Sequence, residues 1–418
     1  DSMKTYLADK TVFHKIIFIS FLTIYGSIYV ITGLVTHLSL VTIINSFSDN
    51  GQLGDFAIYE RAAKLALQGQ SPYFVYHIGA GFLYPPPALF LIEPFLHIQS
   101  SSLKFIVLTV LNVAIIIFIF SKLANRYKVN RGVLLFTFFL IFTFAPLLEL
   151  IYIGQINIVI LLGIFLMFYY EGKRAWLSGF GLALATLIKI TPIFLTLYLI
   201  ANRRLKEIKF FVGFIVFFSA LSIIRYGMKP WLEFPSLLTW LTNQYPIDTN
   251  SQSTISNLLD FIWRMQYRFD PSPNLFSMNV KLLHLSIVSV LIGICLLTAL
   301  GIFFKRNEST KNQKETLLIV LLMAMTLMPN IVWYHHYLFL TLALAIWVYR
   351  QKLTLSVSLW CLIGLLLIQI DRFYLTGGLM VHIFVYISLG VLFFTSVQIP
   401  KLSEIAQAWN LFQQKYEN

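Results

Sequence analysis

Long runs of apolar residues, separated by short polar connections, dominate the sequence. Runs such as 16–44 and 280–304 exceed the roughly 20 residues that a helix needs to cross about 30 Å of hydrocarbon. Together with a helical hairpin at 176–201, they predict an all-α polytopic membrane protein with about twelve transmembrane helices. The single spans are expected at 15–42, 105–121, 132–148, 154–170, 210–225, 279–304, 316–333, 337–349, 353–370 and 379–397.

Two apolar segments are interrupted by proline. Residues 84–98 open with three consecutive prolines and contain a further Pro94, so we expect a re-entrant or juxtamembrane segment there and no crossing. Residues 176–201 lie between two basic clusters, with Pro192 near their middle. Because proline removes a helical hydrogen bond, we expect a hairpin that enters and returns, with Lys189 near its outer turn.

The distribution of basic residues predicts the orientation. Clusters of Lys and Arg mark cytoplasmic connections, and they place both termini inside. Two large loops, 45–104 and 226–278, then fall on the extracytoplasmic side, where their aromatic and proline residues predict that they fold against the membrane. We expect one integral-membrane domain over residues 1–418 that ends in a cytoplasmic tail at 401–418.

Composition excludes several other classes of protein. With 58% hydrophobic and 12% charged residues and a mean hydropathy of +0.77, the chain is no ordinary soluble domain. Its net charge of +13 reflects basic cytoplasmic connections, so the expected partner is the lipid bilayer and not nucleic acid. Neither a P-loop nor a dinucleotide fingerprint is present. A paired-Asp cluster of the kind that holds Mg²⁺ is also missing, which argues against a cytosolic nucleotide-sugar donor.

Asp55 is the first candidate for chemistry. It opens an expected amphipathic helix at 55–68, which Gly69 ends. The apolar face of that helix is formed by Phe56, Tyr59, Ala63 and Leu67. Asp commonly caps helices, whereas a carboxylate on an outward-facing loop also suits a transferase. The spacing leaves both roles open.

Lys189 and a pair of histidines lie near the expected outer surface. A lysine at membrane depth is costly unless it is paired, so it marks a functional candidate, although it can also snorkel to the interface. His335 and His336 lie between two spans and could bind a phosphate, transfer a proton or belong to an aromatic belt. Adjacent rings diverge on a helix, so we expect no metal site.

Amides form the remaining candidates. Gln155 and Asn157 open a span from its outer end, where they either join helices or line a polar cavity. Gln252 and Asn257 lie in the second large loop, before Leu258. Taken alone, these amides carry little information.

The order of these positions resembles a known family, glycosyltransferase family 87, the polyprenyl-phosphate-mannose-dependent mannosyltransferases of the GT-C superfamily. The resemblance runs from about residue 45 to about residue 340 and departs from the family pattern at Ser71, which stands where that pattern has Asp. After the early Asp55 and Tyr59, it is carried by Gly69-Gln70-Ser71-Pro72-Tyr73, Tyr84-Pro85-Pro86-Pro87, Gly154-Gln155-Ile156-Asn157, Lys189-Ile190-Thr191-Pro192, Ser251-Gln252-Ser253, Asn257-Leu258-Leu259 and Trp333-Tyr334-His335-His336.

The resemblance implies a GT-C-type fold with an extracytoplasmic active site in a bacterial or archaeal cytoplasmic membrane. The donor would be a polyprenyl monophosphate sugar, expected to be mannose, and the acceptor a hydroxyl of a glycolipid or glycan. Asp55 and His335 would be catalytic, while Lys189 and His336 would bind the donor phosphate. No metal or other cofactor is expected. The implied substrate-binding residues are Tyr59, Tyr84, Gln155, Asn157, Gln252 and Asn257.

Two other functions fit parts of the pattern. A lipid or ion transporter would use Lys189 and the histidines as a translocation path, but it predicts polar residues throughout the membrane depth. A lipid-diphosphate-linked oligosaccharide polymerase or ligase favours clustered arginines in the external loops, where Arg264 and Arg268 are the only close pair.

Overall fold

The computed structural model describes residues 54–74, 81–243, 285–286, 288–289, 292–293, 295–303, 311–329 and 333–350. Within these ranges every regular element is a helix, and no strand occurs. The predicted first span, the last two spans and the C-terminal tail lie outside the described residues, as do Gln252 and Asn257.

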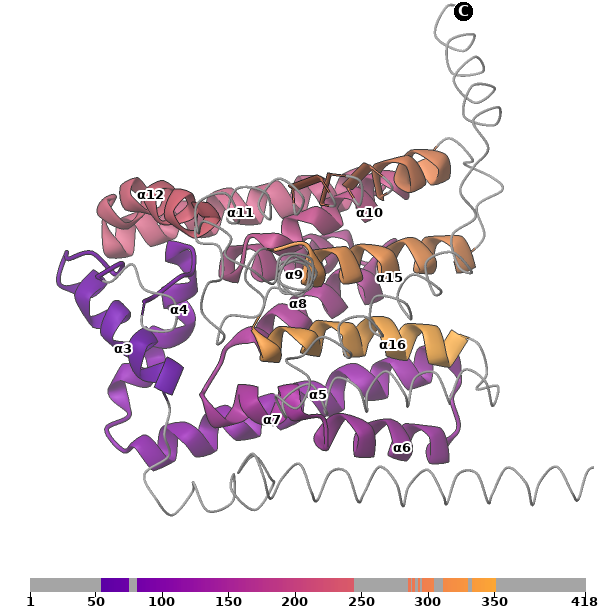
Figure 1. The fold of residues 1–418 in the computed structure, drawn as a ribbon, viewed down its shortest axis with the longest axis horizontal. Coiled ribbons are helices and arrows are strands. Elements are labelled where there is room, and N and C mark those ends of the chain that lie inside the picture. The colour runs from indigo at the N-terminus through magenta and orange to yellow at the C-terminus, as the bar shows by residue number, and fades with distance from the viewer. Residues whose placement is uncertain are drawn as a thin grey trace, which may run out of the picture.

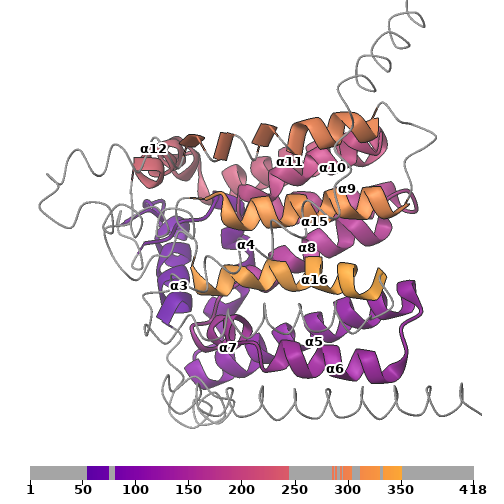
Figure 2. The same ribbon diagram turned by 45° about the vertical axis from the view of Figure 1, so that its right-hand side comes forward.

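The long helices lie side by side, and shorter helices gather at one of their ends (Figures 1 and 2). That end carries α3, α4 and α12, which appear on the left of both views. In chain order the elements are α3 (Gly54–Leu67), η1 (Pro86–Ala88), α4 (Leu89–Ile92), η2 (Glu93–His97), α5 (Ser101–Tyr127), α6 (Arg131–Phe142), α7 (Ala145–Tyr152), α8 (Asn157–Tyr170), α9 (Ala175–Ile188), η3 (Thr191–Leu195), α10 (Thr196–Ala201), α11 (Leu205–Tyr226), α12 (Lys229–Asn243), α15 (Lys311–Leu327), η4 (Tyr334–Tyr337) and α16 (Leu338–Arg350).

Two of the described helices, α5 and α11, are long and apolar enough to cross a membrane, and α6 with α7 makes a third if that bent pair is one span. Both long helices expose apolar side chains, such as Val110 on α5 and Ile224 on α11, as a lipid-facing surface does. The chain is therefore a helical protein with candidate membrane spans. The count of about twelve stays a prediction.

The segment between α5 and α8 differs from its predicted form. Two spans were expected at 132–148 and 154–170, but within the first of them α6 ends at Phe142 and α7 follows at a bend of 55°. Pro146 occupies the first turn of α7. Proline is common at that position, whereas in the interior of one continuous helix it would remove a hydrogen bond. Gly154 then adopts a left-handed φ of 71°, so that Gln155 precedes α8 instead of lying inside it.

The helices α8, α9 and α11 pack unusually closely, through glycines. A Cβ on Gly181 of α9 would lie 2.5 Å from the carbonyl oxygen of Gly163 on α8, and one on Gly179 would lie 2.6 Å from the carbonyl oxygen of Glu207 on α11. Small residues allow the backbones of neighbouring membrane helices to approach in this way. This packing fixes the end of α9, where Lys189 lies, relative to the start of α8.

The predicted hairpin at 176–201 is present. Helix α9 ends at Ile188, and the chain returns through η3, with Pro192 in its first turn, and α10. The chain returns to the end of the hairpin where α9 began, because the Tyr198 hydroxyl on α10 donates to the carboxylate of Glu171, which follows α8. Arg204 binds the same carboxylate at 2.9 Å. The break at Lys189 therefore lies at the opposite end from Glu171.

The end that contains Glu171 is basic. Arg126 of α5 lies 3.9 Å from Glu315 of α15, and Arg350 of α16 donates to the carbonyl oxygen of Asn312 at 2.9 Å. These contacts bring the ends of several helices together. The connections at this end also carry Lys128, Arg131, Lys173, Arg174, Arg203, Arg204 and Lys311.

The segment 84–98 forms no span, as predicted. Its helical pieces, η1, α4 and η2, have three to five residues each. Glu93 attaches this segment to α11, because its carboxylate pairs with Arg225 and accepts a hydrogen bond of 2.7 Å from the Tyr226 hydroxyl. The segment thereby closes one side of the end opposite the basic one.

Candidate active site

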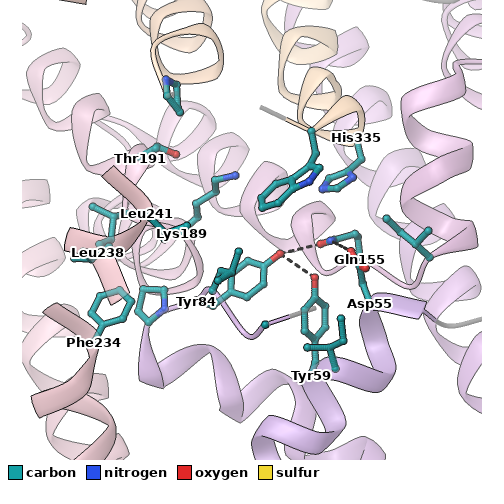
Figure 3. Close-up of a pocket in the computed structure, with 18 of the residues that line it drawn as sticks. Asp55, Tyr59, Tyr84, Gln155, Lys189, Thr191, Phe234, Leu238, Leu241 and His335 are labelled. Carbon is teal, nitrogen blue, oxygen red and sulfur yellow. Dashed lines mark hydrogen bonds between the residues drawn. The ribbon is translucent and has the colours of Figure 1, made fainter. Parts of the chain in front are cut away.

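A cavity of about 370 Å³ lies at the end opposite the basic one, within the usual size range of small-molecule sites. Parts of the chain that are far apart in sequence form its walls (Figure 3). It is lined by Asp55, Ile58, Tyr59, Gly81, Leu83, Tyr84, Pro85, Glu149, Ile153, Gln155, Lys189, Ile190, Thr191, Phe234, Leu238, Leu241, Pro329, Trp333 and His335.

Asp55 is held at the cavity by the first turn of α3. The backbone N–H groups of Asp55 and Phe56 both donate to the carbonyl oxygen of Ile153, at 3.1 and 3.3 Å, which satisfies donors that the start of a helix leaves free. The Phe56 ring is fully buried and makes an edge contact with the ring of Phe95 in η2. Burial raises the pKa of the Asp55 carboxyl above its ordinary value, while a hydrogen bond from Gln155 acts against that rise.

A chain of hydrogen bonds runs from Asp55 into the protein (Figure 3). The side-chain amide of Gln155 donates to Asp55. The Tyr84 hydroxyl donates to Gln155 Oε1 at 2.9 Å, and the Tyr59 hydroxyl lies 2.9 Å from that of Tyr84. A further hydroxyl, that of Tyr73, donates to the backbone carbonyl of Tyr84 at 3.0 Å. These contacts unite α3, the 84–98 segment and the start of α8.

Lys189 lies across the cavity from Asp55, and its side chain extends toward the space between them (Figure 3). Its Nζ is 2.6 Å from Nε2 of His336. The other nitrogen of that ring, Nδ1, accepts a hydrogen bond of 3.2 Å from the backbone N–H of Trp333. His336 thus supports Lys189 and is not itself part of the cavity lining.

His335 lines the cavity directly. Its side chain is 2% exposed and stacks on the Trp333 ring with a centroid separation of 6.2 Å. Neither ring nitrogen has a hydrogen-bond partner among the described residues. Because buried polar groups are normally paired, this imidazole is suited to a bound ligand.

The remaining wall of the cavity is apolar. Phe234, Leu238 and Leu241 project from α12, and Ile190 follows Lys189 (Figure 3). One side of the cavity therefore presents a carboxylate with its amide and hydroxyl partners, a second presents an amine and an imidazole, and a third offers aliphatic and aromatic surface.

The structure brings together most, but not all, of the sequence-predicted residues. Asp55, Tyr59, Tyr84, Gln155, Lys189 and His335 meet at the cavity, whereas Asn157 is fully buried in α8 and does not line it. On the amphipathic helix, Leu67 is 37% exposed, which differs from its expected place on the buried face because α3 ends there.

Sequence reasoning did not identify Glu149, Trp333 or the apolar face of α12 as cavity residues. Glu149 gave one signal, because it is a carboxylate in an otherwise apolar stretch. The Ser71 hydroxyl donates to the carboxylate of Glu233 on α12. A carboxylate therefore still stands beside the position where the family pattern has Asp.

The described part of the chain contains no group of three His, Cys, Asp or Glu side chains that could hold a metal ion. The polar residues that line the cavity carry both hydrogen-bond donors and hydrogen-bond acceptors. Carboxylate, amide, amine and imidazole groups around one small space are typical of group-transfer sites.

Comparison with known proteins identifies the family. The sequence model of glycosyltransferase family 87 matches residues 82–329, more than half of the 418-residue chain. The match includes Tyr84, Gln155 and Lys189, while Asp55 lies before its start and His335 after its end. No curated protein and no solved structure shows a significant match. With its helical architecture and a cavity suited to group transfer, the chain belongs to glycosyltransferase family 87.

Proposed function

We propose that the protein transfers a sugar, mannose, from a polyprenyl monophosphate donor to a hydroxyl of a glycolipid or glycan acceptor. The observation that carries this proposal is a single cavity lined by a carboxylate, by an amine and an imidazole, and by an apolar surface. A sugar linked through phosphate to an isoprenoid chain presents a matching set of groups. Membership of a glycosyltransferase family favours transfer over the transporter alternative.

In the proposed reaction Asp55 is the general base. It accepts the proton of the acceptor hydroxyl while that oxygen attacks the anomeric carbon of the donor. The bond between the anomeric carbon and the phosphate oxygen breaks, and the polyprenyl phosphate leaves with the electron pair. A single displacement inverts the configuration, so that a β-linked donor gives an α-linked product.

Lys189 and His335 would stabilise the departing phosphate. Charge develops on the phosphate oxygens as the bond breaks, and donors that are already in place stabilise it at little reorganisation cost. Among the described residues, neither ring nitrogen of His335 has a hydrogen-bond partner, and Lys189 contacts a ring nitrogen of His336. Since a monophosphate carries less charge than a diphosphate, we expect the reaction to need no metal ion.

The proposed location of the cavity is the outer part of the membrane. Basic connections mark the cytoplasmic side, which would place the cavity toward the extracytoplasmic side. Helices α8 and α9 have 14 residues each, about 21 Å at 1.5 Å per residue, whereas the hydrocarbon is about 30 Å thick. The cavity would then lie below the outer surface, and a lipid-linked donor could reach it without leaving the bilayer.

The test is a transfer assay with the purified full-length protein, synthetic polyprenyl-phosphate mannose and candidate acceptors. Asp55→Asn should lower turnover at least about 10²-fold, the lower range for loss of a general base, without lowering the thermal stability. The matched control is Glu60→Gln on the same helix. The Glu60 carboxylate accepts a hydrogen bond from Lys104, and the new amide oxygen can still do so. Near-normal transfer by Asp55→Asn would contradict the proposed role.

A second test concerns metal dependence. Loss of wild-type activity in excess EDTA, restored by Mg²⁺ or Mn²⁺, would contradict the metal-free mechanism.

A further inference from the structure

We infer that Tyr84 and Gln155 are positioning residues, which hold one carboxylate oxygen of Asp55 and leave the other free to accept the acceptor's proton. This inference rests on the proposed role of Asp55. It also revises the substrate-binding role that the sequence suggested for Tyr59, Tyr84 and Gln155, because their polar groups bind one another.

The direction of each hydrogen bond in this chain can be deduced. An ionised carboxylate only accepts hydrogen bonds, so Gln155 must present its NH₂ group to Asp55 Oδ2. The amide oxygen then faces Tyr84, whose hydroxyl donates to it at 2.9 Å. Because a hydroxyl has a single proton, the Tyr59 hydroxyl must be the donor in its 2.9 Å contact with Tyr84.

The chain therefore runs from Tyr59 through Tyr84 and Gln155 to Asp55, with every donor pointing toward the carboxylate. Such chains polarise each bond in the same sense. Burial raises the pKa of the Tyr84 hydroxyl, so this group keeps its proton and stays a donor at neutral pH. Among the described residues, Oδ2 is the Asp55 oxygen that takes a side-chain hydrogen bond, which leaves Oδ1 for the proton transfer.

The members of the chain are fixed by the fold. Gln155 is 4% exposed, and its backbone N–H donates to the carbonyl oxygen of Leu150 at 2.9 Å. The backbone of Tyr84 is held by the Tyr73 hydroxyl at 3.0 Å. The two middle members, Tyr84 and Gln155, thus come from separate segments, whereas Asp55 and Tyr59 both lie on α3. Removing the Tyr84 hydroxyl would let the Gln155 amide rotate away from Asp55.

The pH dependence of the reaction gives the chain a measurable signature. Activity needs ionised Asp55, so it is present above the pKa of that carboxyl and is lost as pH falls through it. The bond from Gln155 lowers this pKa against the effect of burial. Weakening the hydrogen bond from Gln155 should therefore move the acid limb of the pH–activity profile, where activity is lost as pH falls, to higher pH. The other titratable groups around the cavity, which remain in the variants of Gln155, are Tyr59, Tyr84, Glu149, Lys189 and His335.

The experiment measures kcat and KM against pH for the full-length protein with synthetic polyprenyl-phosphate mannose. Tyr84→Phe keeps the ring and removes one hydroxyl, and we expect kcat to fall about tenfold, the upper range for one hydrogen bond. Donor KM should stay nearly constant, and the acid limb should move to higher pH. Gln155→Leu should shift the acid limb in the same direction and further. Tyr59→Phe, which removes only the donor farthest from Asp55 along the chain, should have the smallest effect.

Two outcomes separate this inference from its alternatives. A rise in donor or acceptor KM for Tyr84→Phe with an unmoved acid limb would show substrate binding and overturn the positioning role. Full activity of Asp55→Asn would instead overturn the proposed general base itself. If Gln155→Leu unfolds in a thermal melt, Tyr84→Phe alone still decides, because it removes a single oxygen.

Discussion

The side-chain partner of Lys189 determines what this residue can bind. None of the ion pairs in the described part of the chain includes it, and its side-chain partner is the imidazole of His336. A carboxylate partner would place a fixed negative charge beside the Lys189 amine, whereas a neutral imidazole brings none. Lys189 is therefore well suited to bind an incoming anion.

At the residue scale we predict that Lys189→Ala weakens donor binding about 10- to 100-fold, the range for a hydrogen bond to a charged group. Lys189→Arg should retain part of the affinity, because the charge persists while the geometry changes. Equilibrium binding of polyprenyl-phosphate mannose is the measurement. Lys64→Ala, an exposed position on α3, is the matched control. Unchanged affinity in Lys189→Ala would assign the lysine to the membrane interface.

At the element scale, the close contact between α8 and α9 determines where the polar residues of the cavity lie. Gln155 precedes α8 and Lys189 follows α9, so both positions depend on the spacing of these two helices. The spacing is set by Gly163 and Gly181, each of which meets the backbone of the other. A larger side chain at either position must separate the helices.

We predict that Gly181→Val destabilises the protein by about 1–3 kcal/mol, the usual cost of overpacking, and strongly reduces transfer. Its Cβ would lie 2.5 Å from the carbonyl oxygen of Gly163. Gly213→Val on α11 is the matched control, because nothing lies within 4 Å of the added Cβ there and the helix propensity changes equally. Thermal unfolding in detergent and the transfer assay provide the readouts. Equal melting temperatures for the two variants would show that the close contact between Gly163 and Gly181 does not set the spacing of α8 and α9.

At the scale of the whole molecule, the two ends of the helix bundle have different chemistry. One end gathers basic connections around the carboxylates of Glu171 and Glu315. The other holds the cavity, which residues of α3 and α12 help to line. This polarity suits a protein that faces the cytoplasm with one end and its substrates with the other.

We predict that this polarity matches the orientation in the membrane. In a background without Cys295 and Cys361, a cysteine replacing Gln70 should react with an impermeant thiol reagent added outside intact cells. A cysteine replacing Leu205, which is 64% exposed, should react only after the cells are permeabilised. External labelling of the Leu205 variant would reverse the orientation and move the cavity to the cytoplasmic side.

The sequence by itself determined the helical class, the amphipathic helix at Asp55 and the hairpin that turns at Lys189. These features follow from local causes: the length of apolar runs, the spacing of apolar residues and the effect of Pro192 on a helix. The same local patterns were less reliable for the stretch after α5. There the helix expected at 132–148 is bent before Pro146, and the left-handed Gly154 lies before α8, where the next span was expected to begin.

Only the tertiary structure decided how the polar residues meet. Asp55 and Gln155 are 100 positions apart, and the contact between Lys189 and His336 joins positions 147 apart. The pairing of such residues depends on how helices pack and on glycine contacts such as that of Gly181, which leave no local periodic signal. For the same reason the sequence could not distinguish a helix cap from a cavity carboxylate at Asp55, nor a substrate ligand from a positioning residue at Gln155.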